Sequence, residues 1–266
     1  MIRTLFEVLK DVIYESLLLI GPERIKITTM DSSKSSLVYM HLKASSFEEY
    51  HCAEENHVGV SMLSLFKLIK TISSKTDIVT FFLHKDRCHE LGIGIHNEYN
   101  KSSTVFSLKI LDLNHLNINI PTFEYDKIVT LPSTTFQKLC RDMMNLSSFV
   151  LIESSPNKLT LSVQGDFASQ STTFLQGDRE EDREEDREED SQQQDERGES
   201  SFDGLFSLKF LNLFGRSSSL SPNVTMYLKK SHPMVLSYEI GSLGELKFLL
   251  TPQIDGDDDD DDEMDG

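Results

Sequence analysis

Apolar residues recur at helical spacing in four segments of the chain, and the segments between them alternate or are rich in β-branched residues. Positions three, four and seven residues apart share one face of a helix, so each segment predicts an amphipathic helix. The fourth segment is less regular, because apolar residues surround it. The apolar stripes are Leu5, Val8, Leu9, Val12, Ile13 and Ser16; Met62, Leu65, Phe66, Ile69 and Ile72; Phe136, Leu139, Cys140 and Met143, opened by Pro132-Ser133; and the segment 205–214.

The intervening runs predict short strands, too many for an all-helical protein. The expected strands are 25–30, 37–43, 78–83, 91–96, 103–111, 127–131, 149–153, 158–163, 172–175, 223–228, 234–240 and 245–250.

The first and third helical segments echo one another. Leu5-Phe-Glu-Val-Leu-Lys-Asp-Val-Ile matches Phe136-Gln-Lys-Leu-Cys-Arg-Asp-Met-Met, 131 positions later, and Lys67-Leu-Ile matches Lys209-Phe-Leu, 142 positions later. Two matches in the same order indicate a duplicated unit with two helices and a sheet in each half. We therefore expect a first domain at 1–112, a linker at 113–132 and a second domain at 133–254.

Two low-complexity segments carry all of the net charge. Residues 178–199, with a repeated Asp-Arg-Glu-Glu, and the tail 255–266 each have a net charge of −9, which together make up the formal net charge of −18. Neither segment can bury apolar area, so we expect a solvated insertion at 178–201 and a disordered tail. The remainder is electrically balanced, and its local field decides which partners it binds.

Each predicted helix carries a basic pair away from its apolar stripe. Three or seven residues separate the members of each pair, so they share a face. A solvated helix face explains any single pair as well as a binding function does, but four pairs favour function. The pairs are Arg3 and Lys10, Lys67 and Lys70, Lys138 and Arg141, and Lys209 and Arg216.

Other chemistries find little support. Three distant cysteines, Cys52, Cys88 and Cys140, imply no disulfide framework and fit a reducing compartment. His84, Cys88 and His89 lack a second Cys/His pair at zinc-ligand spacing, and no phosphate-binding loop or nucleophile motif occurs. No segment is apolar enough to span a bilayer. We expect neither enzyme activity, nor a metal or cofactor, nor a membrane partner.

Four blocks, in order, resemble the proliferating cell nuclear antigen family, the eukaryotic DNA sliding clamp. They are Met30-Asp-Ser-Ser, Cys140-Arg-Asp, Phe206-Ser-Leu-Lys-Phe-Leu-Asn-Leu-Phe and Leu246-Lys-Phe-Leu-Leu-Thr-Pro-Gln-Ile-Asp. The resemblance implies an α+β fold with two repeated clamp domains in each subunit of a homotrimeric ring. Helices then line a central channel, and antiparallel sheets lie outside. It also implies a non-catalytic processivity factor in the nucleus that tethers replicative polymerases and repair proteins to double-stranded DNA.

Three groups of residues match functional positions of that family. Channel cations contact phosphates without reading sequence, which suits a clamp that slides. Partner proteins, among them DNA polymerase and the clamp loader, insert a short motif into a groove beside the linker. An edge strand of one subunit pairs with an edge strand of the next, although periodicity alone would equally allow internal strands here. The implied DNA-binding residues are Arg3, Lys10, Lys67, Lys70, Lys109, Lys138, Arg141, Lys209 and Arg216; the groove residues are Met30, Leu37, Ile118, Ile120, Pro121, Pro233, Leu249, Thr251, Pro252 and Ile254; the interface residues, from strands at 104–111 and 169–175, are Val105, Ser107, Lys109, Ser171, Thr173 and Leu175.

The chain departs from the family pattern at several points. It begins at the first helix, without the usual first strand, and Lys34 and Ser35 replace a histidine and an aliphatic residue of the groove. Pro156 stands where the family has a modifiable lysine, and the acidic insertion follows the expected interface strand. Two other interpretations stay open: an acidic histone-binding or chaperone-type protein, and a subunit of the heterotrimeric checkpoint clamp.

Overall fold

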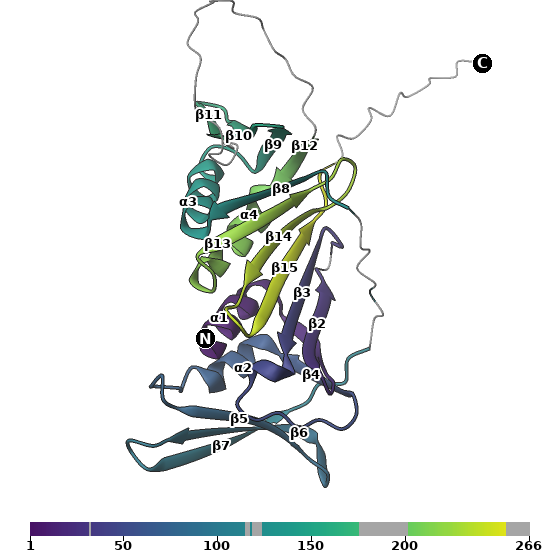
Figure 1. Ribbon diagram of the computed structural model, residues 1–266, viewed down its shortest axis with the longest axis vertical. Coiled ribbons are helices and arrows are strands. Elements are labelled where there is room, and N and C mark those ends of the chain that lie inside the picture. Colours follow the sequence, from purple (N-terminus) through teal and green to yellow (C-terminus); the bar gives the residue numbers. More distant parts are fainter. Residues whose placement is uncertain (32, 115–117, 119–123, 176–201, 254–266) are drawn as a thin grey trace, which may run out of the picture.

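The computed structural model describes residues 1–31, 33–114, 118, 124–175 and 202–253. Four α-helices follow one another along one side of a long sheet (Figure 1). They are α1 (Ile2–Val12), α2 (Met62–Ile69), α3 (Ser133–Met144) and α4 (Leu208–Gly215), with short 3-10 segments η1 (Ala44–Ser46) and η2 (Arg216–Ser219). Helices on one side and antiparallel sheets on the other agree with the predicted α+β class.

An eight-stranded antiparallel sheet runs through both halves of the chain. The halves meet where β3 pairs with β15, in a register that runs from Ser36 opposite Leu250 to Leu42 opposite Gly244. One continuous sheet therefore joins the two repeated units. Its strands, in spatial order, are β4 (Asn56–Ser61), β1 (Glu15–Ile20), β2 (Arg24–Met30), β3 (Ser36–Lys43), β15 (Gly244–Leu250), β14 (Met234–Glu239), β13 (Asn223–Leu228) and β8 (Lys127–Pro132).

Two smaller antiparallel sheets lie at opposite ends of the molecule (Figure 1). One belongs to the first half and contains β5 (Ile78–His84), β6 (Arg87–Asn97) and β7 (Ser102–Lys109), in that spatial order. The other belongs to the second half and has the order β11 (Ser169–Leu175), β10 (Lys158–Gln164), β9 (Phe149–Ser155) and β12 (Phe202–Ser207).

The helical stripes form the core between the helices and the sheets. Leu5 and Leu9 of α1 and Phe136 of α3 are fully buried, as the helical spacing predicts. Phe214 of α4 stacks on Phe248 of β15, with ring centroids 4.3 Å apart. Burial of these faces turns the opposite, polar faces of the helices outward.

Parts of the predicted elements are wrong. The first helix ends at Val12 rather than near Ser16, because the chain turns extended at Ile13 and residues 15–20 pair with β2 and β4. Residues 205–207 belong to β12 rather than to the fourth helix, which leaves Arg216 in η2 just beyond α4. The prediction also missed β1, β4 and β12, whose short runs show no clean alternation of apolar and polar residues.

Candidate nucleic-acid interface

The polar faces of the four helices carry most of the predicted cations. Five of these side chains are exposed and form no ion pair with any described residue, so they are available for phosphates. Lys109 is exposed as well but lies on β7, where it stands opposite Glu90 of β6. The five are Lys67, Lys70, Lys138, Arg141 and Lys209.

The second half gathers three of the cations around one depression. Arg141 of α3, Lys209 of α4 and Arg216 of η2 line a cavity of about 490 Å³, together with Met144 and other residues of α3 and α4. The two helices approach closely at Gly215, where a Cβ atom would lie 3.3 Å from the Cα of Gln137. The absence of a side chain at this position therefore helps to place the cations of α3 and α4 side by side.

Two predicted cations share one carboxylate. The Lys10 ammonium lies 2.7 Å from Asp11 Oδ1, and the Arg216 guanidinium lies 2.6 Å from Asp11 Oδ2. Burial raises the pKa of Asp11, but the hydrogen bonds from Lys10 and Arg216 outweigh it, so the pKa of this carboxyl is lowered. The carboxylate thus stays charged and links the first helix of one half to the end of the last helix of the other.

Two further contacts hold cations of the first half in place. The Lys10 ammonium also lies 5.1 Å above the centre of the Phe66 ring of α2, a cation–π geometry. The Arg3 guanidinium donates a hydrogen bond of 3.0 Å to the carbonyl oxygen of Ile72, just beyond α2. Lys10 and Arg3 therefore also stabilise the packing of α1 against α2.

The predicted partner groove coincides with a small apolar cluster on the outer face of the long sheet. Leu37, Leu249 and Val235 are buried and stand directly opposite one another on β3, β15 and β14. The same row continues to Met30 on β2, which is 39 % exposed, and to Tyr227 on β13. The sheet register therefore brings three predicted residues, Met30, Leu37 and Leu249, into one line.

The remaining predicted groove residues lie around this cluster or outside the described residues. Ile118 packs against it, and Pro233 and Pro252 are half-buried. Thr251 donates from both its backbone N–H and its hydroxyl to the carbonyl oxygen of Ser35, at 3.0 and 3.1 Å. Ile120, Pro121 and Ile254 fall outside the described residues.

Sequence reasoning missed several members of the cluster. Val235, Tyr39, Tyr125 and Tyr227 complete it, and the rings of Tyr125 and Tyr227 lie 5.0 Å apart. The pairing register places Val235 opposite Leu249 and Tyr227 opposite Val235, although these residues are far from Leu37 in the sequence. Tyr39 lies two residues after Leu37 on β3, so strand alternation could have found it.

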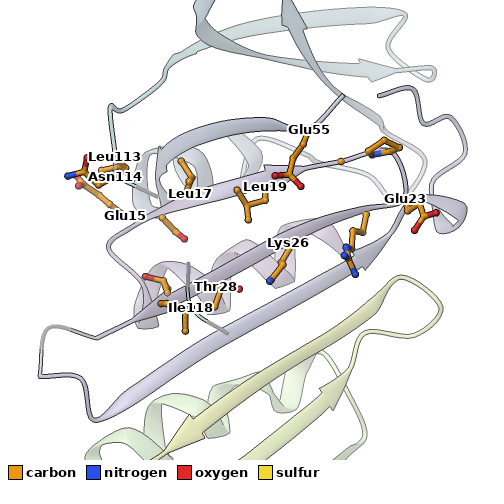
Figure 2. A pocket seen from close by; sticks show the side chains of 15 residues that line it. Glu15, Leu17, Leu19, Glu23, Lys26, Thr28, Glu55, Leu113, Asn114 and Ile118 are labelled. Atoms are coloured by element: carbon orange, nitrogen blue, oxygen red, sulfur yellow. The ribbon is translucent and has the colours of Figure 1, made fainter. Parts of the chain in front are cut away.

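A second hollow lies on the outer face, beside the cluster (Figure 2). It has a volume of about 650 Å³ between the β1–β2 hairpin and the start of the linker. Leu17 and Leu19 of β1 and Lys26 of β2 line it, with Leu113 and Ile118 from the linker. Ile118 lines the hollow and also packs against the groove cluster, so the two features adjoin at this linker residue.

The two predicted interface strands are edges of their sheets within the described residues. β7 pairs with β6 alone in the smaller sheet of the first half, and β11 pairs with β10 alone in that of the second half. Among the described strands, each therefore has one unpaired edge. All six predicted interface side chains are exposed, with Val105 at 63 % and Leu175 at 84 %.

The described residues contain no group of three or more metal-ligating side chains. No described helix is long and apolar enough to cross a membrane. All three cysteines are free, and burial raises the pKa of Cys140 to about 12, so that this thiol is an unreactive core residue.

The repeated plan, with cations on the helical side and open edges at both ends, defines a two-domain clamp subunit. Family models described as the N-terminal and C-terminal domains of proliferating cell nuclear antigen match residues 1–117 and 119–253. The chain belongs to the proliferating cell nuclear antigen family of sliding clamps.

Individual relatives agree with this assignment. The chain is 33% identical over 255 residues to the probable DNA polymerase sliding clamp 1 of Paramecium bursaria Chlorella virus 1, covering 94% of this chain and 92% of the relative. The crystal structure of proliferating cellular nuclear antigen from Entamoeba histolytica has the same fold, with a TM-score of 0.80, 22% identity and 95% coverage of both chains.

Proposed function

We propose that three copies of this chain form a closed ring around duplex DNA and act as a processivity factor for replicative polymerases and for repair proteins. The observation that carries the proposal is the cation set on the helical faces. Five of these side chains are exposed and form no ion pair with a described residue, and they come from three helices in both halves. The role needs no catalytic group, and its place of action is the nucleus.

Long, flexible cations suit a clamp because they hold phosphates without reading bases. The depression lined by Arg141 and Lys209 offers one site for a phosphate. Lys67 of α2 and Lys70, directly after α2, offer a second site in the first half. A duplex in contact with these phosphate-binding sites can move along its axis, because every phosphate presents the same charge.

Ring closure follows from the open edges. β7 and β11 lie at opposite ends of the molecule (Figure 1), so pairing between them is head-to-tail. A head-to-tail interface closes into a ring when the rotation between copies allows it. Each closed junction removes two unpaired sheet edges.

The apolar cluster around Leu37 and Leu249 serves partner proteins on this proposal. A short motif with aromatic side chains fits a surface that already gathers Tyr39, Tyr125 and Tyr227. The polymerase and the clamp loader are the partners expected to carry such a motif.

The channel assignment is tested by charge reversal. Lys70→Glu with Lys138→Glu removes two exposed cations from opposite halves, so polymerase stimulation on primed DNA should fall severalfold. Lys85→Glu with Lys101→Glu, in exposed turns of the smaller sheet of the first half, is the control with the same charge change. Equal effects of the two pairs, with both proteins folded, would refute the channel face.

The ring is tested by light scattering in solution. The unmodified chain should have the mass of a trimer at micromolar concentration. Leu175→Asp, which places a charge on the open β11 edge, should shift the mass toward that of the monomer, while Glu153→Asp inside the same sheet should not. A monomeric unmodified chain would end the ring proposal.

The groove is tested with a fluorescent peptide that carries an aromatic clamp-binding motif. Tyr227→Ala with Pro252→Ala should weaken peptide binding at least tenfold, because it removes one wall and one rim of the cluster. Tyr99→Ala, at a residue that is 92 % exposed on the β6–β7 turn, serves as control. Unchanged affinity in the double variant would place the groove elsewhere.

A further inference from the structure

Asp11 is the one described carboxylate that forms ion pairs with predicted channel cations. Its two oxygens are divided between Lys10, next to it on α1, and Arg216, which is 205 positions away in η2. The Asp11 side chain is 30% exposed, and those of Lys10 and Arg216 are 19% and 53% exposed. The cluster therefore lies at the surface of the helical side, where solvent or another anion can reach it.

The internal repeat supplies a counterpart for comparison. Lys10-Asp11 corresponds to Arg141-Asp142, 131 positions later. Asp142 is exposed on α3 and forms no ion pair with any described residue. Arg141 faces the depression without a carboxylate partner in the described part of the chain. The aspartate of the repeat thus pairs with cations in the first half, as Asp11, and forms no ion pair with a described residue in the second half, as Asp142.

We propose that Asp11 is a built-in competitor of the DNA backbone, which occupies Lys10 and Arg216 until a phosphate displaces it. The inference rests on the proposed function, since it requires DNA against the helices. Asp11 is then a positioning residue, which acts through Lys10 and Arg216 and sets how tightly this point of the channel binds DNA.

The charges of the cluster explain the effect. Two cations and one carboxylate have a net charge of +1, so the cluster attracts a phosphate less strongly than two free cations would. A phosphate that binds here displaces the Asp11 carboxylate from the cations. The electrostatic free energy gained is therefore smaller than at a cation that has no carboxylate partner. Weak holding at one point of the wall favours sliding over arrest.

The experiment measures binding of a short fluorescent duplex to the full-length chain at about 50 and about 200 mM salt. Asp11→Asn keeps the shape of the side chain and raises the net charge of the cluster by one. Each additional phosphate contact steepens the salt dependence by about 0.9 log unit per log unit, so the affinity gain of Asp11→Asn should be about 3.5-fold larger at the lower salt.

Asp142→Asn is the matched control, because it removes the same charge from the corresponding position. Its salt dependence should stay closer to that of the unmodified chain. Equal changes in the two variants would show a general charge effect and overturn the proposal while leaving the channel intact. Loss of salt-dependent DNA binding in the unmodified chain itself would instead overturn the proposed function.

A second pair of variants tests the same inference without changing Asp11. Arg216→Gln should reduce DNA affinity less than Arg141→Gln, because Asp11 already neutralises Arg216 and no described carboxylate pairs with Arg141. An equal or larger loss in Arg216→Gln would show that Asp11 does not compete with DNA.

Discussion

The two halves of the chain follow one plan, yet they bury corresponding strands to different degrees. In the second half β13 lies between β8 and β14, and Val224, Met226 and Leu228 are fully buried. In the first half β5 pairs only with β6 among the described strands, and Val79 and Phe81 are only half-buried. A flanking strand, rather than residue type, thus decides how much of an apolar strand is removed from water.

Three carboxylates of the first half are held by hydrogen bonds. Asp11, Asp31 and Asp77 have lowered pKa values. Burial raises the pKa of Asp11 and Asp31, but hydrogen bonds outweigh it. For Asp77 the hydrogen bond from the Ser74 backbone is the largest cause of the lowering. These three acids therefore stabilise the first half in their ionised form.

Truncation on the two corresponding strands gives the largest contrast. Met226→Ala, on the covered strand, should lower the free energy of unfolding by about 2–5 kcal/mol. Phe81→Ala, on the uncovered strand, removes a larger side chain but should cost about 1–2 kcal/mol, because part of the ring already faces water. Urea unfolding midpoints measure both, with exposed Thr80→Ala as control. A larger loss for Phe81→Ala would contradict the burial argument.

The close approach of α3 and α4 predicts the next effect. Gly215→Val places a branched side chain against the backbone of Gln137, where even a Cβ atom lies at 3.3 Å. Such overpacking should lower the free energy of unfolding by about 1–3 kcal/mol. Gly215→Ala should cost less in the same urea titration. An unchanged midpoint for Gly215→Val would mean that α3 and α4 can move apart without a cost in the free energy of unfolding.

Acid should weaken the contacts of Asp11, Asp31 and Asp77. A carboxyl with a lowered folded pKa stabilises the fold above its unfolded pKa, which is about 3.8, and this contribution is lost as the pH falls through the folded value. Amide hydrogen exchange, compared at about pH 5 and about pH 3 after correction for intrinsic rates, should therefore accelerate at the amides of Ser36 and Ser74, which donate to Asp31 and Asp77. Unchanged exchange at these two amides would contradict this expectation.

The smallest effect concerns the link between Thr251 and Ser35. Thr251→Val removes the hydroxyl hydrogen bond of 3.1 Å but keeps the backbone one. Because Thr251 is exposed, the loss should be about 0.5 kcal/mol, at the low end for hydrogen bonds. Thermal unfolding can detect it against Thr80→Val, a control at an exposed position of β5. A loss of several kcal/mol would show that this contact holds the halves together.

The sequence predicted the helices best, because their apolar stripes are long enough to define a period. Leu5, Leu9 and Phe136 are buried as expected, and α3 begins at Ser133 as predicted. The strands at 15–20 and 56–61 were missed, since pairing with distant segments rather than local alternation makes them strands. The family resemblance supplied the site residues; periodicity alone would not have distinguished them from a solvated face.

Two features of the candidate site lay beyond any local pattern. The ion pair of Asp11 with Arg216 joins α1 to the first residue of η2, 205 positions away, so that no spacing rule could reveal it. Val235 and Tyr227 join the groove only through the registers of β14 with β15 and of β13 with β14. Both features arise from long-range geometry, which the sequence encodes but does not display.

The pairing of β3 with β15 has a mechanical consequence. Seven consecutive residue pairs join the two repeats in one continuous sheet, so bending between the repeats would break the hydrogen bonds of the whole β3–β15 pairing. In the proposed ring of three such subunits, the weakest contacts are those between separate subunits. Loading the proposed ring onto DNA that has no free end would therefore open one of these interfaces, with each subunit left intact.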